Sequence, residues 1–431
     1  MTDKIGRRGH LRGLGAVAAT GLAAPAFAQA KPEQLVIMGH AVHRQSATGA
    51  KGGDSAGEWA TANGLRLEWL TFGVPEIHDR LYREASLVQG SVDLGLVANR
   101  YVGPRIAQLF EPLDDFLRRE PIEDFAEIAP GMVATMTFEG KIYGIPYRHA
   151  TSGLHFNRVY LAERGIAAPP KTMEELIEQA EKLTFKRADG QQVHGLILDG
   201  TSPVQIVDIA RAWNGDFLTA DYQLRVTDEP MIRTVTLLRD FFAKGVLPRN
   251  FTKFTTEETI AYMTSGRGAM AITPFGRTET FNDPAKSQVA GQMGVAAVPS
   301  AASFQDRFPV APAKTEFWAF VIPRNTANKA LAWSLIRQLS TKANTIRAGI
   351  NGNGPVRPSA YADPTLRAMI PYADSEAAVL KVARAPLPGW DNAARAEDIF
   401  REELELVLIA GKSPQAAMES VAKRVQPLLA K

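Results

Sequence analysis

Residues 138–184 constrain the fold more than any other stretch, because they place two strands and a helix in direct succession. Glu139 and Gly140 suit a tight turn, residues 141–146 favour an extended strand, and residues 152–157 favour a second strand. The polar residues between the two strands mark a point where the chain can bend, as the hinge of a two-lobed protein does.

A helix is predicted to follow at residues 173–183, where apolar side chains recur at helical spacing and Thr172 with Glu175 has the spacing of a capping box. The same succession of elements runs through the whole chain. Short apolar strands are expected near residues 35–38, 65–70, 92–97, 268–272 and 318–322, and helices near residues 77–89, 231–244, 329–339, 394–410 and 414–429. This alternation predicts α/β lobes with largely parallel sheets.

The first thirty residues have the pattern of an export signal peptide. Basic residues precede a mildly apolar run at residues 13–24, and small residues offer cleavage sites after Ala28 or Ala30. The pair Arg7 and Arg8 resembles a twin-arginine signal, although the flanking residues depart from that motif, and the general secretory route is the alternative. The predicted location is therefore the periplasm, reached by the Tat route.

Composition narrows the partners of the exported chain. Without residues 1–30 it has 45 basic and 45 acidic residues, which gives no reason to expect nucleic acid or an anionic membrane as a partner. The absence of cysteine excludes disulfides, thiolate metal sites, a cysteine nucleophile and a lipid-anchored N-terminal cysteine. About 400 residues exceed the ~250–300 at which a single core stops growing, so two lobes are expected.

Six segments carry a family resemblance and occur in a consistent order. They are residues 138–184, 213–228 (WNGDFLTADYQLRVTD), 263–277 (MTSGRGAMAITPFGR), 317–323 (FWAFVIP), 352–360 (GNGPVRPSA) and 411–417 (GKSPQAA). Together they resemble family 1 extracellular solute-binding proteins of ABC importers, the carbohydrate-type periplasmic binding proteins. The resemblance implies a two-lobed α/β clamshell of type II with three inter-lobe crossings, no cofactor and no catalysis. It also implies that a captured sugar or sugar derivative is delivered to the permease subunits of an ABC transporter.

The resemblance also divides the chain. Lobe 1 is expected to comprise residues 31–147 and 313–357, and lobe 2 residues 148–312 and 358–431. Residues near 147–151, 300–316 and 355–363 would then absorb the rotation as a monomeric protein closes on its solute.

Sugar binding needs aromatic faces and planar polar groups in loops at strand ends. The residues that combine such a side chain with such a position are His40, His43, Arg44, Asn99, Tyr147, Arg148, His149, Trp213, Phe275, Arg277, Arg357 and Trp390. Arg148 and His149 stand where the resembling family often has a small or acidic residue. This difference favours an anionic ligand, such as a sugar acid, sulfonate or phosphate, or else an Arg148 that pairs with a carboxylate and latches the lobes.

Two other classes of function compete with solute transport. His40 and His43 have a spacing that metal ligands use, but no third ligand accompanies them, and no metal is predicted. Ser55, in a predicted loop at residues 49–57, superficially resembles a hydrolase serine, yet the chain has no nucleophile elbow and no metalloprotease motif. An exported hydrolase and a non-transport binding or adhesion protein remain the alternatives.

Overall fold

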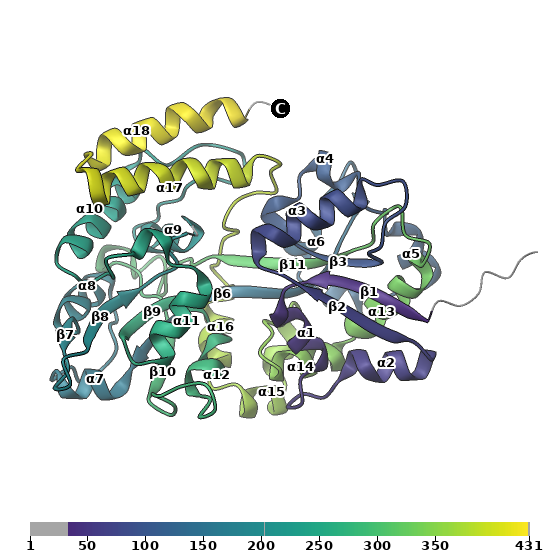
Figure 1. Cartoon of the computed structure of the whole chain (residues 1–431), viewed down its shortest axis with the longest axis horizontal. Coiled ribbons are helices and arrows are strands. Elements are labelled where there is room, and N and C mark those ends of the chain that lie inside the picture. Colours follow the sequence, from purple (N-terminus) through teal and green to yellow (C-terminus); the bar gives the residue numbers. More distant parts are fainter. Residues whose placement is uncertain (1–32, 202, 430–431) are drawn as a thin grey trace, which may run out of the picture. The chain divides into compact units, whose positions relative to one another are not determined.

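The computed structural model describes residues 33–201 and 203–429 (Figure 1). The predicted signal peptide, residues 1–30, lies outside the described residues. From Glu33 onwards the described chain forms one compact unit.

A mixed sheet runs through this unit. Its strands, among the described residues, are β1 (Gln34–Gly39), β2 (Arg66–Thr71), β3 (Leu94–Ala98), β6 (Ile145–Asn157), β7 (Phe185–Lys186), β8 (Gln192–Ile197), β9 (Gly268–Pro274), β10 (Met293–Ala297) and β11 (Thr315–Val321). They follow the order β2-β1-β3-β11-β6-β9-β8-β7, and β10 pairs with β6; β4 (Thr137–Phe138) and β5 (Lys141–Ile142) form a separate hairpin. The prediction of largely parallel sheets is wrong at the centre, because β11 and β6 run antiparallel to their neighbours.

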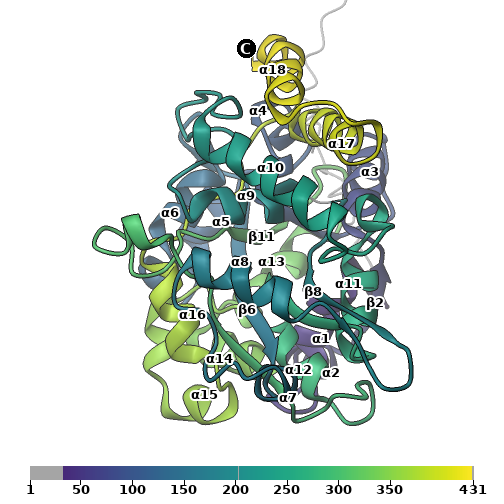
Figure 2. The same cartoon turned by 90° about the vertical axis from the view of Figure 1, so that its left-hand side faces the viewer.

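Helices cover the sheet. They are α1 (Ala41–Thr48), α2 (Ser55–Asn63), α3 (Val74–Ala85), α4 (Pro104–Ala107), α5 (Asp114–Arg119), α6 (Pro130–Thr135), α7 (Arg158–Glu163), α8 (Met173–Lys182), α9 (Pro203–Arg211), α10 (Glu229–Ala243), α11 (Thr256–Thr264), α12 (Arg277–Asn282), α13 (Lys329–Leu339), α14 (Lys342–Ile350), α15 (Pro364–Met369), α16 (Ala373–Leu380), α17 (Ala393–Ala410) and α18 (Pro414–Val425). The C-terminal pair α17 and α18 packs beside α10 (Figure 2). In the part of the chain that the structure describes, no helix has the length and apolar character needed to cross a membrane.

Two sequence predictions about helix starts change in detail. The hydroxyl of Thr172 accepts a hydrogen bond from the Glu175 backbone N–H at 3.1 Å, but the Glu175 carboxylate turns to the Lys171 backbone N–H, so only half of the capping box forms. Ser55 does not lie in a loop: Asp54 caps α2 with its carboxylate, and Ser55 is the first helical residue.

Strand β6 joins two hydrophobic cores. Its first half pairs with β11 and places Ile145 and Tyr147 in a core built around β1, β3 and α13, whereas its second half pairs with β9 and places Leu154 and Phe156 in a core built around β8, β9 and α10. The two strands predicted at residues 141–146 and 152–157 are therefore wrong as separate elements, since one strand runs from Ile145 to Asn157. Figure 1 shows β6 and β11 side by side between the two groups of helices.

Candidate functional site

The pairing of β6 with β11 decides which side chains share a face. Arg148 lies opposite Trp318, and Ala150 lies opposite Glu316. Side chains alternate along a strand, and directly paired residues point to the same side. Arg148, Ala150 and Ser152 therefore lie on one face of the two strands, together with Trp318 and Glu316; we call this the Arg148 face.

A cavity of about 30 Å³ opens on the Arg148 face. Its lining comes from α1, from the loop after α14 and from the end of β9 with α12: Val42, Gln45, Arg148, Pro274, Gly276, Arg277, Glu279, Thr280, Asn351 and Gly352. The loops that follow β1 and β9 thus meet at the carboxyl ends of their strands, where ligands bind in open α/β sheets. The volume suits about one water molecule, so a larger solute has to enter while the surrounding segments move apart.

Arg148 and Arg277 both line this cavity, and neither forms an ion pair at contact distance, although the charges of Glu376 and Glu257 act on Arg148 and Arg277, respectively, from farther away. Within residues 33–201 and 203–429, no carboxylate lies within 4.0 Å of either guanidinium group, and the buried Nε atom of Arg148 has no hydrogen-bond partner. Burial, followed by the positive charge of Arg277, lowers the pKa of Arg148 to about 10. Burial also lowers the pKa of Arg277. A buried pair of like charges is costly unless an anion joins it.

His40 and His43 add neutral donors beside the two arginines. The Nδ1 atom of His43 accepts from the His40 backbone N–H at 3.0 Å, and Nδ1 of His40 accepts from the Val42 N–H at 3.2 Å, so in both rings Nε2 carries the hydrogen. Nε2 of His43 is buried without a partner among the described residues. Burial, then the charges of Arg277 and Arg148, lowers the pKa of His40 to about 4. Burial, then Arg148, lowers the pKa of His43 well below its usual value. Both rings are therefore uncharged at neutral pH.

His149 lies on the opposite face of β6 and belongs to a buried network. Its Nε2 is 2.9 Å from the Tyr361 hydroxyl, its Nδ1 is 2.9 Å from the Thr151 hydroxyl, and Tyr361 donates to Glu376 at 2.7 Å. Burial raises the pKa of Glu376 to about 8, which leaves this carboxyl protonated at neutral pH. Among the described residues, no carboxylate lies within ion-pair distance of Arg148, the contact that the latching alternative requires.

Glu376 should make the protein lose stability as the pH rises. An unfolded glutamate ionises near its usual pKa, while the folded protein keeps the proton up to about pH 8, so stability falls between these two values and is level above them. Glu376→Gln cannot ionise and keeps a group that can hydrogen-bond to Tyr361. We expect urea unfolding to show that the free energy of unfolding of the variant, relative to that of the wild type, rises by a few kcal/mol from pH 5 to pH 8. An equal difference at both pH values would contradict the buried, protonated state of Glu376.

The aromatic candidates lie in the cores. Tyr147 packs on Phe320 with ring centroids 4.4 Å apart, Trp213 is 3% exposed, and the indole N–H of Trp390 donates to the Leu428 carbonyl at 3.1 Å. Phe275 lies next to cavity residues but is fully buried and stacks on Tyr372 at 5.8 Å. None of these four rings presents an open face, so we leave them out of the proposed site.

The remaining polar candidates do not line the cavity at Arg148. Arg357 is fully buried and donates to the backbone carbonyls of Asp124, Glu123 and Ser340 at 2.6–2.8 Å. The side-chain oxygen of Asn99 accepts from the Phe317 N–H at 3.1 Å and so fixes β11. Arg44 is exposed on α1. Of the twelve candidates, the structure brings Arg148, Arg277, His40 and His43 together.

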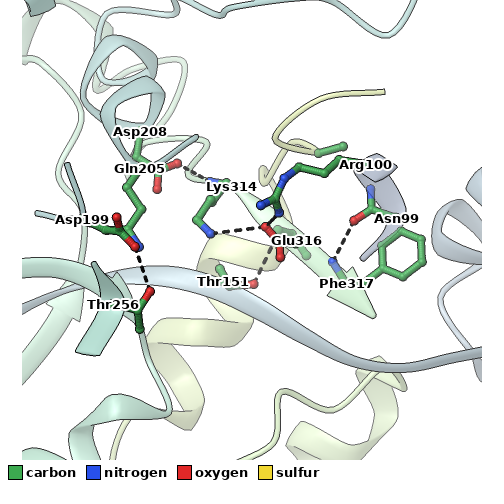
Figure 3. Close-up of polar contacts among 12 residues, drawn as sticks. Asn99, Arg100, Thr151, Asp199, Gln205, Asp208, Thr256, Lys314, Glu316 and Phe317 are labelled. Carbon is green, nitrogen blue, oxygen red and sulfur yellow. Dashed lines mark hydrogen bonds and ion pairs between the residues drawn. The ribbon is translucent and has the colours of Figure 1, made fainter. Parts of the chain in front are cut away.

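Sequence reasoning missed a second polar cluster on the Arg148 face (Figure 3). Glu316 forms an ion pair with Arg100 and lies 3.8 Å from the ammonium group of Lys314. The side chain of Asp208 accepts a hydrogen bond from the Lys314 backbone N–H at 2.5 Å. Arg100 also pairs with Glu397 of α17 at 2.9 Å. Burial lowers the pKa of Lys314 to about 8. Asp208 is the one carboxylate of the buried helix α9, and a fully buried aspartate is rare unless it is paired.

The opposite face holds a larger cavity of about 320 Å³, lined by Thr315 and Phe317 of β11, by α6 and by residues 355–358 and 380–385. Its charged residue, Arg384, already bonds the side chain of Asn214 at 2.5 Å. This cavity lacks the unpaired charge of the smaller one, and we place the functional site at Arg148. Among the described residues, no group of three or more His, Asp or Glu side chains is arranged to hold a metal ion.

The hydrolase alternative has no support in the geometry around Ser55. This residue is 3% exposed, and its hydroxyl donates to the Asn344 side chain at 2.9 Å. A nucleophilic serine needs a base within hydrogen-bond reach and an approach path for substrate, and Ser55 has neither among the residues described.

Two known proteins are similar to most of this chain in sequence. A protein of Brucella abortus (strain 2308) with the name "Putative binding protein BAB2_0491" is 23% identical over 352 residues, which cover 79% of this chain and 80% of that protein. A Deinococcus radiodurans protein with the name "Probable ABC transporter-binding protein" is 22% identical over 320 residues, which cover 72% of this chain and 74% of that protein.

Solved structures agree on the architecture. Maltose-bound T. maritima MalE3 superposes with a TM-score of 0.78 at 19% identity, covering 92% of this chain and 100% of that one. UgpB from Mycobacterium tuberculosis, in complex with glycerophosphocholine, superposes with a TM-score of 0.75 at 19% identity, covering 93% and 98%. The fold is thus the two-lobed α/β clamshell of the periplasmic binding proteins. Residues 56–373 match the family model described as bacterial extracellular solute-binding protein, and the chain belongs to that family.

Proposed function

We propose that this protein is the periplasmic solute-binding component of an ABC importer, and that it captures a carbohydrate derivative carrying an anionic group. The sugar acids, sulfonates and phosphates are the candidate classes. The observation that carries the proposal is the pair Arg148 and Arg277, which lines one cavity without a carboxylate partner. The names of relatives support an ABC importer, and the neighbours' ligands include a neutral sugar and a phosphodiester.

The chemistry of the cavity favours an anion over a neutral sugar. Guanidinium groups present planar forks that match carboxylate, sulfonate and phosphate oxygens, and charge-assisted hydrogen bonds are about twice as strong as neutral ones. The neutral His40 and His43 rings carry Nε2 hydrogens, so they add donors without adding charge. The side chains of Glu279 and Lys51, 3.3 Å apart, neutralise each other at the edge of the site.

Capture would proceed by closure of two lobes, which we propose to be residues 31–147 with 313–357 and residues 148–312 with 358–431. Arg148 lies at their boundary in β6, while Arg277 begins α12 in lobe 2 and His43 belongs to α1 in lobe 1. A ligand that contacts groups from both lobes stabilises the closed state by its difference in affinity for the two states. That state, in a monomeric protein exported through its signal peptide, would dock on the permease and release the solute unchanged.

A thermal-shift screen with charge-matched pairs tests this function. Glucose with glucose 6-phosphate, galactose with galacturonate, and glycerol with glycerol 3-phosphate differ mainly in the anionic group. We expect the anionic member of at least one pair to raise Tm, since a ligand at a hundred times its Kd adds about 2.7 kcal/mol of stability. Stabilisation by neutral sugars alone would contradict the anion site. The absence of any shift would favour the adhesion alternative.

A further inference from the structure

We propose that the solute is two-ended: its anionic group binds at Arg148 and Arg277, and hydroxyl groups at its other end bind a second subsite formed by Ser152, Asp208 and Lys314. This inference rests on the proposed function, and it adds a length and a second chemical group to the solute.

The two subsites lie on the same face of one strand. Arg148, Ala150 and Ser152 are alternate residues of β6, so their side chains point to the same side. At ~3.3 Å per residue, about 13 Å of strand separate Arg148 from Ser152. Ala150, between them, has only a methyl group, and Glu316 lies opposite it on β11. Lys314 lies next to Ser152, because the Ser152 backbone N–H donates to the Lys314 carbonyl at 3.3 Å.

The second subsite contains buried polar atoms that lack partners. Asp208 and Ser152 are fully buried, and neither the Oδ2 atom of Asp208 nor the hydroxyl of Ser152 has a partner with good hydrogen-bond geometry among the described residues. Burial, the largest influence, raises the pKa of Asp208, and the Ser152 hydroxyl lowers it, so these two groups lie beside each other. Buried polar groups of this kind are rarely left unpaired without a functional reason.

The composition of this subsite favours hydroxyl groups over a charged group. Asp208 and Ser152 offer acceptors, and the ammonium group of Lys314 offers donors, so together they can bond adjacent hydroxyls that both donate and accept. A second anionic group would meet Asp208 and Glu316, and a cationic group would meet Lys314 and Arg100. A neutral polyol or sugar ring avoids both repulsions.

Closure explains how a solute reaches these buried groups. Arg100 follows β3 in lobe 1 and pairs with Glu316 at the centre (Figure 3). It also bonds Glu397 of α17 in lobe 2. Separation of the lobes breaks the contact with Glu397 and uncovers the Arg148 face along β6. The solute would then lie lengthwise on this face before the lobes close.

Isothermal titration with three phosphates of increasing length tests the two-ended solute. Inorganic phosphate fills only the Arg148 end, glucose 6-phosphate adds one ring, and trehalose 6-phosphate adds two. In the wild type we expect affinity to rise at least tenfold from inorganic phosphate to the better sugar phosphate. Asp208→Asn and Ser152→Ala should each lower the affinity for that sugar phosphate about tenfold, the loss of one buried hydrogen bond, and leave inorganic phosphate unaffected.

The outcomes distinguish a failure of the second subsite from a failure of the proposed anion-binding function. If all three phosphates bind the wild type equally, or if both variants bind the sugar phosphate like the wild type, the second subsite is refuted while the anion site stands. If none of the three binds, and the charge-matched screen is also negative, both proposals fail. Ser152→Ala removes one hydroxyl and keeps the backbone hydrogen bond to Lys314, so it carries the test should Asp208→Asn not fold.

Discussion

Replacing Arg148 with methionine should abolish tight binding of the anionic solute and, at the same time, stabilise the ligand-free protein. The loss of a buried, charge-assisted contact costs ~3 kcal/mol in binding, which corresponds to a drop in affinity of at least ~100-fold. In the ligand-free protein, however, Arg148 is 8% exposed and has no carboxylate partner, so an apolar side chain of similar length removes a cost. We expect the free energy of unfolding to rise by about 1 kcal/mol.

Urea unfolding without ligand and titration calorimetry with the best anionic solute measure the two effects on one variant. Arg44→Met is the matched control, because Arg44 is exposed on α1 near the same cavity, and this variant should change neither quantity. A loss of affinity accompanied by a large loss of stability would mean that Arg148 supports the fold. Unchanged affinity would remove it from the site.

Arg357 is a second buried arginine, and its replacement should lower stability without changing ligand affinity, the opposite of what we expect for Arg148. Its guanidinium group donates to three backbone carbonyls, those of Glu123, Asp124 and Ser340. Arg357→Met leaves these acceptors without a partner in a buried place, which should lower the free energy of unfolding by about 3 kcal/mol. Urea unfolding measures this loss, and calorimetry should show that the folded variant binds the solute with wild-type affinity. A variant of normal stability and weakened binding would instead place Arg357 at the ligand.

The sequence predicts those elements whose local pattern agrees with their environment. The helix at residues 329–339 has the predicted bounds of α13, and α17 begins one residue before the predicted start. The centre of β6 is different, because residues 147–152 are polar and resemble a bend when considered alone. Pairing with β11 on one side and β9 on the other keeps them extended, and this tertiary effect outweighs local preference.

The site was predictable only in part. Arg148 and Arg277 follow the strands predicted at residues 141–146 and 268–272, and the structure brings both to one cavity, although Arg148 lies within β6. Arg357 has the same local appearance, but its three carbonyl partners are distant in sequence and cannot be inferred from the residues around it. The sequence does not reveal the environment of the tryptophans for a similar reason: Trp213 and Trp390 occur in turn-rich segments, but both side chains pack in the core. Asp208 has a signal in the sequence, because it is a single carboxylate in the largely apolar segment at residues 203–210.

Titration calorimetry of one charge-matched pair tests the central claim, that Arg148 and Arg277 form the binding site for an anionic group. The anionic solute that most stabilises the protein is titrated against its uncharged counterpart, with wild type, Arg277→Met and the control Arg44→Met. We predict that the wild type and the control bind the anion at least ~100-fold more tightly than the neutral compound, and that Arg277→Met loses this preference. Equal affinity of the wild type for both compounds, or an undiminished preference in Arg277→Met, would contradict the claim.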